Sequence, residues 1–151
     1  MNTILFPGSF NPFTVGHRSL VERVLPLFDR VVIAIGVNSQ KACEARTHER
    51  LDAIRALYAA EPKVSVIAYS GLTVDVCEAE GARWMLRGVR SVADFEYERN
   101  LADINRRISG IETLLLFTLP EYAAISSSVV RELQAYGRDV SEFLPEGPGK
   151  P

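Results

Sequence analysis

LFPGSFNPFTVGH, residues 5–17, is the stretch that decides the fold of this 151-residue chain. An apolar run, Thr3–Phe6, predicts a strand that leads into a turn rich in glycine and proline, and a helical pattern of apolar residues starts at His17. A glycine-rich loop between a strand and a helix offers free backbone N–H groups beside the positive end of the helix dipole. Such a loop suits a phosphate group, so we predict a nucleotide phosphate site here, with His17 directed at the bound anion.

Apolar runs and helical patterns alternate along the rest of the chain. Four more strands are predicted, at Arg30–Val37, Lys63–Ala68, Trp84–Leu86 and Glu112–Leu119. Helices are predicted to begin near Thr47 and Thr73, to cover Ser91–Ser109 and to follow Ser126–Ser128. Strands that are apolar on both faces and alternate with helices indicate a parallel sheet. We therefore expect an α/β fold with a single doubly wound five-stranded parallel sheet, in one domain over residues 1–151, with about 146–151 as a flexible tail.

The loops that follow the predicted strands carry side chains that can donate hydrogen bonds to phosphate. In doubly wound sheets, ligands bind beyond the carboxyl ends of the strands, where the strand order reverses. These loops are expected at residues 7–17, 38–41, 71–73, 87–90 and 120–128, and they contain Ser9, Thr14, His17, Lys41, Arg87, Arg90 and Ser126–Ser128. Cations gathered there, in a chain whose net charge is −2, indicate a local anion site rather than scattered surface charge.

Composition and missing motifs exclude several classes of protein. The slightly negative net charge argues against a nucleic-acid partner. No apolar run is long enough for a membrane span, and the N-terminus lacks the basic region of a signal peptide. Cys43 and Cys77 match no metal or redox spacing, so we expect reduced thiols in a soluble, cytoplasmic protein. The P-loop, the Gly-x-Gly-x-x-Gly fingerprint and the Gly-x-Ser-x-Gly elbow are all absent.

Two segments far apart in the sequence carry a family resemblance. Thr14-Val15-Gly16-His17 resembles the Thr/His-x-Gly-His motif of the nucleotidylyltransferase superfamily, and Ile125-Ser126-Ser127-Ser128 resembles its second motif, at a helix N-terminus. Within that superfamily, the stretches PGSFNPFT, RGVRSVADFEYE and DVSEFLP resemble the bacterial phosphopantetheine adenylyltransferases, and the likeness covers the chain from Ile4 to about Pro145.

The resemblance implies a Rossmann-like nucleotidylyltransferase fold and a homohexameric enzyme of coenzyme A synthesis. The expected reaction transfers AMP from ATP to 4′-phosphopantetheine, giving dephospho-coenzyme A and pyrophosphate, with Mg²⁺ held by the ATP phosphates and by no direct protein ligand. By position, phosphopantetheine would contact Ser9, Lys41, Thr73 and Arg87. ATP would contact Ser9, Phe10, His17, Gly88, Val89, Arg90, Glu98, Tyr122, Ala123, Ala124, Ile125, Ser126, Ser127 and Ser128.

Such a transfer needs hydrogen-bond donors that stabilise negative charge more than it needs a general base. The nucleophile is a phosphate oxygen that is already anionic, so the reaction needs alignment of two polyanions and charge stabilisation on the α-phosphate. We therefore expect His17 to stabilise the transition state, with Lys41 and Arg90 as further catalytic cations.

Other interpretations remain open on the sequence alone. Glu98 lies on a helical pattern that also fits a solvated face, and Ser126–Ser128 also fits a simple helix cap. Asn11 stands where the resembled family usually has aspartate, which leaves the effect on Mg²⁺ or on the loop open. The alternative functions are a sibling nucleotidylyltransferase acting on nicotinate mononucleotide or glycerol phosphate, and a non-catalytic nucleotide-binding module.

Overall fold

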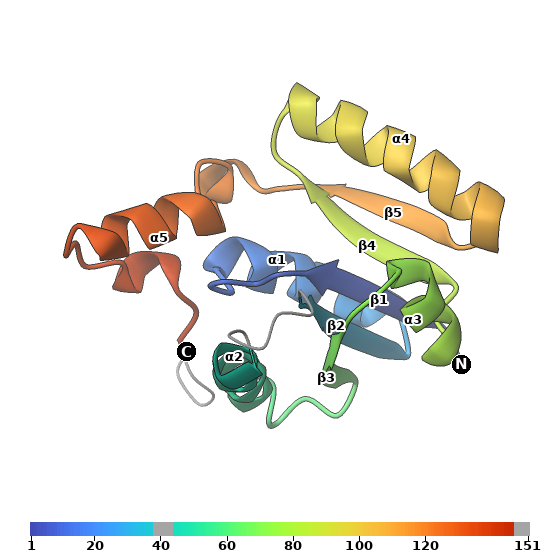
Figure 1. Cartoon of the computed structure of the whole chain (residues 1–151), viewed down its shortest axis with the longest axis horizontal. Helices are drawn as coiled ribbons and strands as arrows, with labels where there is room; N and C mark the ends of the chain where they lie inside the picture. The colour runs from blue at the N-terminus through green and yellow to red at the C-terminus, as the bar shows by residue number, and fades with distance from the viewer. Residues whose placement is uncertain (38–43, 147–151) are drawn as a thin grey trace.

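A five-stranded parallel sheet with strand order β3-β2-β1-β4-β5 forms the centre of the molecule (Figure 1). The computed structural model describes residues 1–37 and 44–146. The strands are β1 (Thr3–Gly8), β2 (Arg30–Gly36), β3 (Val64–Tyr69), β4 (Trp84–Val89) and β5 (Glu112–Phe117). The helices are α1 (Val15–Val24), α2 (Glu44–Leu57), α3 (Thr73–Ala79), α4 (Val92–Ser109) and α5 (Ser127–Ala135). The predicted doubly wound parallel sheet is confirmed, since all four strand pairs are parallel.

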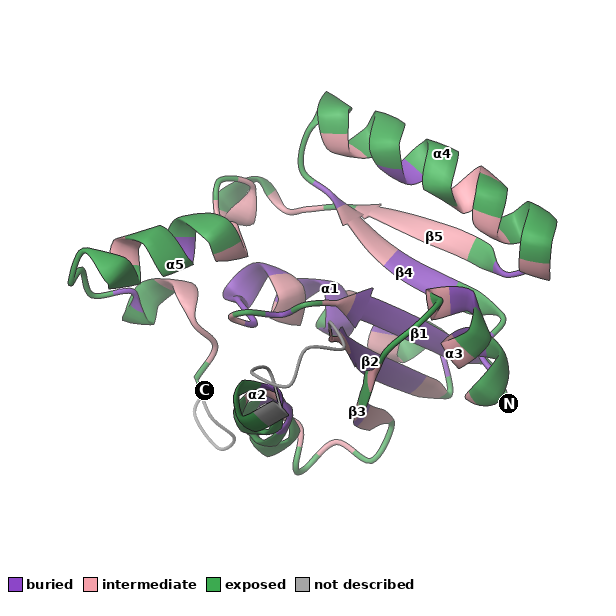
Figure 2. Ribbon diagram, viewed as in Figure 1, coloured by how far each residue is buried: buried purple, intermediate pink, exposed green. Residues whose placement is uncertain are grey.

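Helices cover both faces of the sheet, which is why its central strands are buried (Figure 2). On one face, apolar side chains of α1 and α2, such as Leu20 and Ile54, pack against Ile4 and Ile33 of the central strands. On the other face, α3 contributes Val74 to a smaller cluster. Burial of this kind is the main favourable term in folding. Among the residues that the structure describes, none of the helices has the length and apolar content needed to cross a bilayer.

The strand order reverses between β1 and β4, and these two strands separate at their carboxyl ends. They pair only at Ile4 with Trp84 and Leu5 with Met85, whereas β1 and β2 pair along the whole length of β1. The last residues of β1 and β4 are therefore free to line a ligand site between them, as expected at the switch point of a doubly wound sheet.

The predicted strands at Thr3–Phe6 and Glu112–Leu119 end two residues from the observed ends, at Gly8 and Phe117, and two other predicted boundaries are wrong by three residues. The fourth strand was expected to end at Leu86, with a loop over 87–90, but β4 continues to Val89 because its backbone pairs with β5 as far as Phe117. This pairing outweighs the low strand propensity of Gly88. The second helix begins at Glu44 instead of near Thr47, since residues 44–46 (Glu, Ala, Arg) are all good helix formers.

Candidate active site

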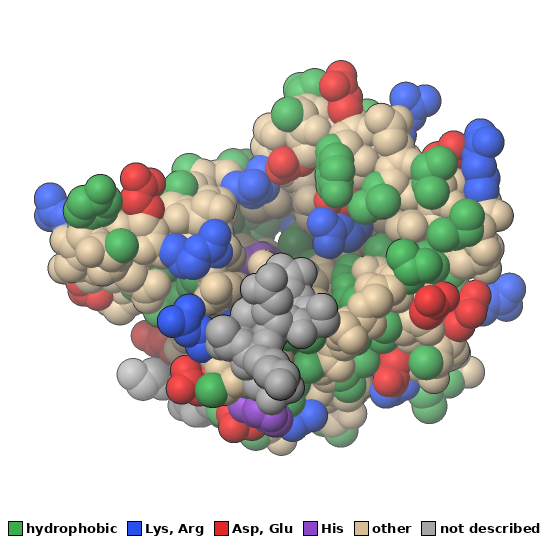
Figure 3. All heavy atoms as spheres, viewed as in Figure 1, with side chains coloured by type: hydrophobic (Ala, Val, Ile, Leu, Met, Phe, Trp, Pro, Cys, Tyr) green, Lys and Arg blue, Asp and Glu red, His purple; other side chains and the backbone are tan. Residues whose placement is uncertain are grey.

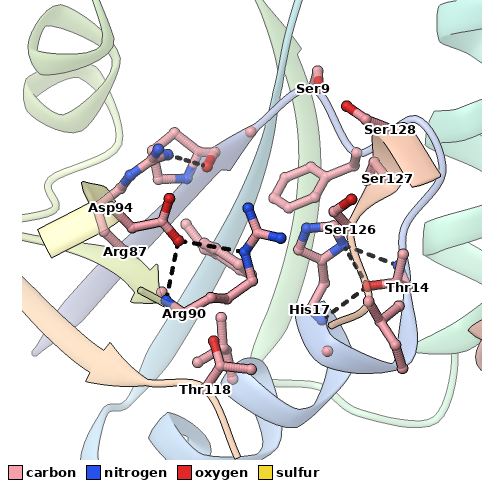
Figure 4. Close-up of a pocket in the computed structure, with 18 of the residues that line it drawn as sticks. Ser9, Thr14, His17, Arg87, Arg90, Asp94, Thr118, Ser126, Ser127 and Ser128 are labelled. Atoms are coloured by element: carbon pink, nitrogen blue, oxygen red, sulfur yellow. Dashed lines mark hydrogen bonds and ion pairs between the residues drawn. The ribbon is translucent and has the colours of Figure 1, made fainter. Parts of the chain in front are cut away.

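A cavity of about 430 Å³ opens at the carboxyl ends of β1 and β4 and is closed on the far side by the start of α5. This volume lies in the range of small-molecule sites. Figure 3 shows a hollow in this face of the molecule, with Lys and Arg side chains around it. The polar side chains that line the cavity come from four parts of the chain, and Figure 4 shows how they face one another.

The first wall is the N-terminus of α1, where His17 is held by a capping box. Thr14 is the N-cap; its backbone N–H donates to His17 Nδ1 at 2.9 Å, and its hydroxyl accepts from the His17 backbone N–H at 3.4 Å. A ring nitrogen that accepts from an N–H cannot carry a proton itself. The proton of the neutral ring therefore sits on Nε2, which is left as a donor for a ligand in the cavity.

The surroundings of His17 favour this neutral form. Its ring packs against Phe10 and Phe13, with ring centroids 5.0 and 5.3 Å away. The pKa of His17 is lowered from 6.5 to about 4, chiefly by burial and also by the positive charges of Arg90 and Arg87. His17 is therefore an uncharged Nε2–H donor at neutral pH, which suits a donor to an anion and not a proton acceptor.

The loop between β1 and α1 is shaped around Phe10. This residue has a left-handed backbone, with φ of 46°, which is costly for a bulky side chain, and its ring lies over Gly8. A Cβ on Gly8 would come within 2.9 Å of the ring, so glycine is required there. Phe10 therefore packs the loop and also forms part of the wall of the cavity.

The second wall is formed by Arg87 and Arg90 at the end of β4. Arg87 donates from Nη1 to the Pro7 carbonyl of β1 at 2.9 Å, across the gap where β1 and β4 separate. Arg90 follows the strand, and in Figure 4 its guanidinium reaches across the cavity toward His17. Both arginines are held by carboxylates of α4, and the positive charge lies where two bound polyanions would need it.

The open question about Glu98 is settled against a solvated face. Glu98 is only 6% exposed, and its two carboxylate oxygens accept hydrogen bonds from Arg87 at 2.7 and 2.9 Å. Its neighbour in the same pattern, Glu96, is exposed. Periodicity could not separate the two because the burial of Glu98 depends on an arginine that comes from another element.

The third wall is the start of α5. Ser126 is the N-cap and its hydroxyl accepts from the backbone N–H of Val129, as the local sequence predicted. Ser127 donates from Oγ to the Pro12 carbonyl at 2.8 Å, which ties α5 to the loop between β1 and α1. Ser128 accepts from Arg131, a cavity-lining cation that also donates to the Asn11 carbonyl.

Sequence reasoning missed four polar residues that line the cavity, namely Asp94, Tyr97, Thr118 and Arg131. For Arg131 a local signal was available in its position one turn after Ser128, because residues three apart on a helix share a face. The backbone carbonyl of Asn11 accepts a hydrogen bond from Arg131, while the side chain of Asn11 is exposed.

Most of the residues expected to bind substrates come together in this cavity. The expected residues that line it are Ser9, Phe10, His17, Arg87, Gly88, Arg90, Glu98, Ile125, Ser126, Ser127 and Ser128. Val89, Tyr122, Ala123, Ala124 and Thr73 lie outside its lining. Val89 is buried, Tyr122 packs beside Gly16 of α1, and Thr73 shares a hydrogen bond with the hydroxyl of Tyr69 at 2.8 Å. Lys41 lies outside the described residues.

Comparisons with known proteins agree with this fold. Residues 5–133 match the model of the cytidylyltransferase-like family. The chain is 52% identical to a phosphopantetheine adenylyltransferase of Phocaeicola vulgatus, with 97% of each chain covered. It is 55% identical to one of Porphyromonas gingivalis, covering 97% of this chain and 95% of the relative.

A solved structure gives the same architecture at greater distance. A protein of Vibrio parahaemolyticus assigned as a nicotinate-nucleotide adenylyltransferase superposes with a TM-score of 0.65 at 20% identity, covering 97% of this chain and 95% of that one. At that identity the likeness concerns the fold alone. The family match and the relatives at 52% and 55% identity define this fold and site as those of a nucleotidylyltransferase. The chain belongs to the cytidylyltransferase-like family and, within it, to the phosphopantetheine adenylyltransferases.

Proposed function

We propose that this protein transfers AMP from ATP to 4′-phosphopantetheine, forming dephospho-coenzyme A and pyrophosphate in coenzyme A synthesis. The observation that carries the proposal is the convergence of a neutral His17, Arg87, Arg90 and the capped start of α5 on one cavity at the switch point of the sheet. The choice of acceptor is supported by relatives named phosphopantetheine adenylyltransferase, which are 52% and 55% identical to this chain over 97% of its length.

The reaction is an in-line displacement at the α-phosphorus of ATP. A phosphate oxygen of the acceptor forms the new P–O bond, the bond to pyrophosphate breaks, and no side chain is required to take a proton. His17 would donate from Nε2 to the α-phosphate as negative charge grows there, and Arg90 would stabilise the same charge. Lys41 is proposed as a second catalytic cation, because its position corresponds to a substrate-binding position of the resembled family.

We propose Mg²⁺ as the cofactor, bound through the phosphates of ATP. Mg²⁺ keeps several waters and binds readily to substrate phosphates. Within residues 1–37 and 44–146 no three His, Cys, Asp or Glu side chains gather where they could hold a metal ion. Bound in this way, the ion would neutralise part of the phosphate charge. The protein's own donors would then orient the chain of phosphates.

The choice of acceptor can be tested directly. Purified protein is given ATP and Mg²⁺ with phosphopantetheine, nicotinate mononucleotide or glycerol phosphate in separate reactions, and pyrophosphate release is measured. We expect release with phosphopantetheine alone. Release with one of the other acceptors would identify a sibling enzyme, and release with none would indicate a non-catalytic module; either result contradicts the proposal.

Replacing His17 tests its role. His17→Ala removes the Nε2–H donor and should lower kcat on the order of 10²–10³-fold, the typical loss for one donor to a developing oxyanion. The KM for ATP should change little, because the contact strengthens mainly in the transition state. His48→Ala is the matched control, since His48 is exposed on α2. Turnover by His17→Ala near that of the control would refute a catalytic role.

We also propose that the protein acts as a homohexamer in the cytoplasm. Support for self-association comes from α4, which exposes an apolar stripe formed by Tyr97, Leu101, Ile104 and Ile108. Support for the compartment comes from the proposed substrates, which are intracellular metabolites.

A further inference from the structure

The end of β1 and the loop that follows it are held by side chains of β4, α2 and α5. Four backbone carbonyl oxygens, those of Pro7, Ser9, Asn11 and Pro12, accept hydrogen bonds from Arg87, Arg50, Arg131 and Ser127 in that order. The C=O and N–H groups of a trans peptide point in opposite directions. Donors that hold carbonyls of the loop therefore also decide where its amide N–H groups point.

Arg50 is the one donor of these four that does not line the cavity of the candidate active site. Arg87, Arg131 and Ser127 all line it, so they can reach a ligand themselves. Arg50 lines a second cavity instead, of about 310 Å³, whose other walls include Phe10 and Phe13. An effect of Arg50 on a substrate would therefore have to pass through the loop.

Packing alone does not fix the loop on the side that faces Arg50. Protein interiors contain few voids larger than a water molecule, whereas the second cavity leaves open space beside Phe10 and Phe13. Within the part of the chain that the structure describes, the polar contact from α2 to the loop is the hydrogen bond from Arg50 Nη1 to the Ser9 carbonyl. This bond therefore sets the position of the loop where packing does not.

The guanidinium of Arg50 is itself held in place. Its Nε donates to the Arg46 carbonyl, one turn earlier, and its Nη2 donates to the Thr47 hydroxyl, each at 3.4 Å. The helix is anchored by Leu51 and Ile54, which are buried in the core. Arg50 therefore offers Nη1 to the loop from a fixed place.

The peptide between Ser9 and Phe10 is the one that Arg50 orients. Its carbonyl faces Arg50, so its N–H points away from that side chain. Phe10 is 2% exposed, and within residues 1–37 and 44–146 no group accepts from this N–H. Buried N–H groups are rarely left unpaired, and one in a glycine-rich loop before a helix suits a phosphate oxygen. The left-handed backbone of Phe10, with φ of 46°, also needs surroundings that hold it.

We propose that Arg50 is a positioning residue for ATP. By holding the Ser9 carbonyl, it directs the Phe10 N–H toward the phosphates of the nucleotide, which it does not contact itself. The inference rests on the proposed function, in which Ser9 and Phe10 bind ATP. It adds to that function a residue of α2 that lies outside the lining of the cavity.

Arg50→Met removes the donors and keeps most of the length of the side chain. Without Arg50 the loop has to be ordered each time ATP binds, so the Kd for ATP should rise about tenfold, as for the loss of one well-oriented hydrogen bond. Isothermal titration calorimetry with ATP and Mg²⁺, without acceptor, measures this Kd. At saturating ATP, kcat should fall by a smaller factor, because His17 and Arg90 are unchanged.

Arg55→Met is the matched control on the same helix. Arg55 donates from Nε and Nη2 to the Val66 carbonyl of β3, at 3.2 and 2.9 Å, so this variant also removes contacts from an arginine to a backbone carbonyl, but ones that join α2 to the sheet. Both variants should lower the urea midpoint of unfolding, and only Arg50→Met should raise the Kd for ATP. An equal Kd in the two variants would overturn the proposal.

Arg50→Lys separates orientation from charge. Lysine keeps the positive charge but is shorter and lacks the fork that bonds Ser9 and Thr47 together, so the Kd for ATP should still exceed that of the wild type. A wild-type Kd in Arg50→Lys would mean that the charge alone matters, which contradicts the proposal. This variant also carries the test if Arg50→Met does not fold.

The ATP titration does not depend on the choice of acceptor. Failure of the proposed function shows as no dephospho-coenzyme A from the wild-type protein with phosphopantetheine. Failure of the positioning role shows as wild-type affinity for ATP in Arg50→Met, whether or not that product forms.

Discussion

At the scale of single residues, the site depends on His17 staying neutral inside a cavity built for anions. The sequence placed this histidine at a helix start next to a phosphate loop, and the capping box with Thr14 follows from that local pattern. The ring's protonation state could not be predicted, because it depends on three phenylalanines and on Arg87 and Arg90 from the end of β4.

The same neutral ring makes stability depend on pH. The pKa of His17 is about 4 in the folded protein, against 6.5 as its ordinary value, because of burial and the nearby arginines. Between these two values the unfolded chain binds a proton that the folded protein does not. The contribution of the neutral His17 ring to the free energy of unfolding is therefore complete above pH 6.5, and it falls as the pH drops toward 4.

This contribution can be isolated with one variant. Urea unfolding of wild type and His17→Gln at pH 7 and pH 4.5 should show that the wild type loses about 2 kcal/mol more on acidification, since glutamine does not titrate. Carboxylates affect both proteins in the same way. An equal loss in both proteins would mean that His17 is not held in the neutral form.

At the scale of elements, sequence patterns predicted the features that depend on neighbouring residues, such as helix caps. They missed the features that depend on contacts between distant segments. Ser91 and Ser126 cap α4 and α5 as their local sequences indicated. The true end of β4 was not predictable, because its last residues are held in the sheet by pairing with β5. Likewise, the role of Glu98 depends on Arg87 from another strand, so no pattern within α4 reveals it.

The contact between β4 and α1 supplies a test at this scale. A Cβ on Gly88 would lie 2.6 Å from Leu20 Cδ1, and Leu20 is buried among core side chains that limit its movement. Gly88→Ala should therefore lower the free energy of unfolding by about 1–3 kcal/mol through overpacking. Circular dichroism during chemical denaturation measures the loss.

A compensating change tells overpacking from backbone strain. Leu20→Val removes one methylene near the added methyl group, so the double variant Gly88→Ala, Leu20→Val should be more stable than the sum of the single effects predicts. Leu20→Val alone is the control. Strictly additive losses would show that the close approach of Leu20 is not the reason for glycine at this position.

At the scale of the whole molecule, α4 joins the site to the outer surface. Its inner side holds Glu98 and Asp94 against the arginines, and its exposed stripe of Tyr97, Leu101, Ile104 and Ile108 has the alternating three- and four-residue spacing of helices that pack on one another. In the proposed homohexamer, a second copy of this chain would present its own α4 to this stripe, so the assembly and the orientation of the arginines would depend on the same helix.

Ile104→Glu tests that connection, because a charge in the middle of the stripe cannot be buried against another copy without a large penalty. Ile104 is 53% exposed in the single chain, so the variant should fold, and its mass by light scattering should fall from that of the wild-type assembly to that of a smaller species. Arg99→Glu, exposed on the same helix but outside the stripe, should keep the wild-type mass.

If contact with the neighbouring copy stabilises α4, Ile104→Glu should also raise the KM for both substrates, since Arg87 and Arg90 are held by this helix. A wild-type protein that is monomeric, or an Ile104→Glu variant with unchanged mass, would rule out the stripe as the contact between copies.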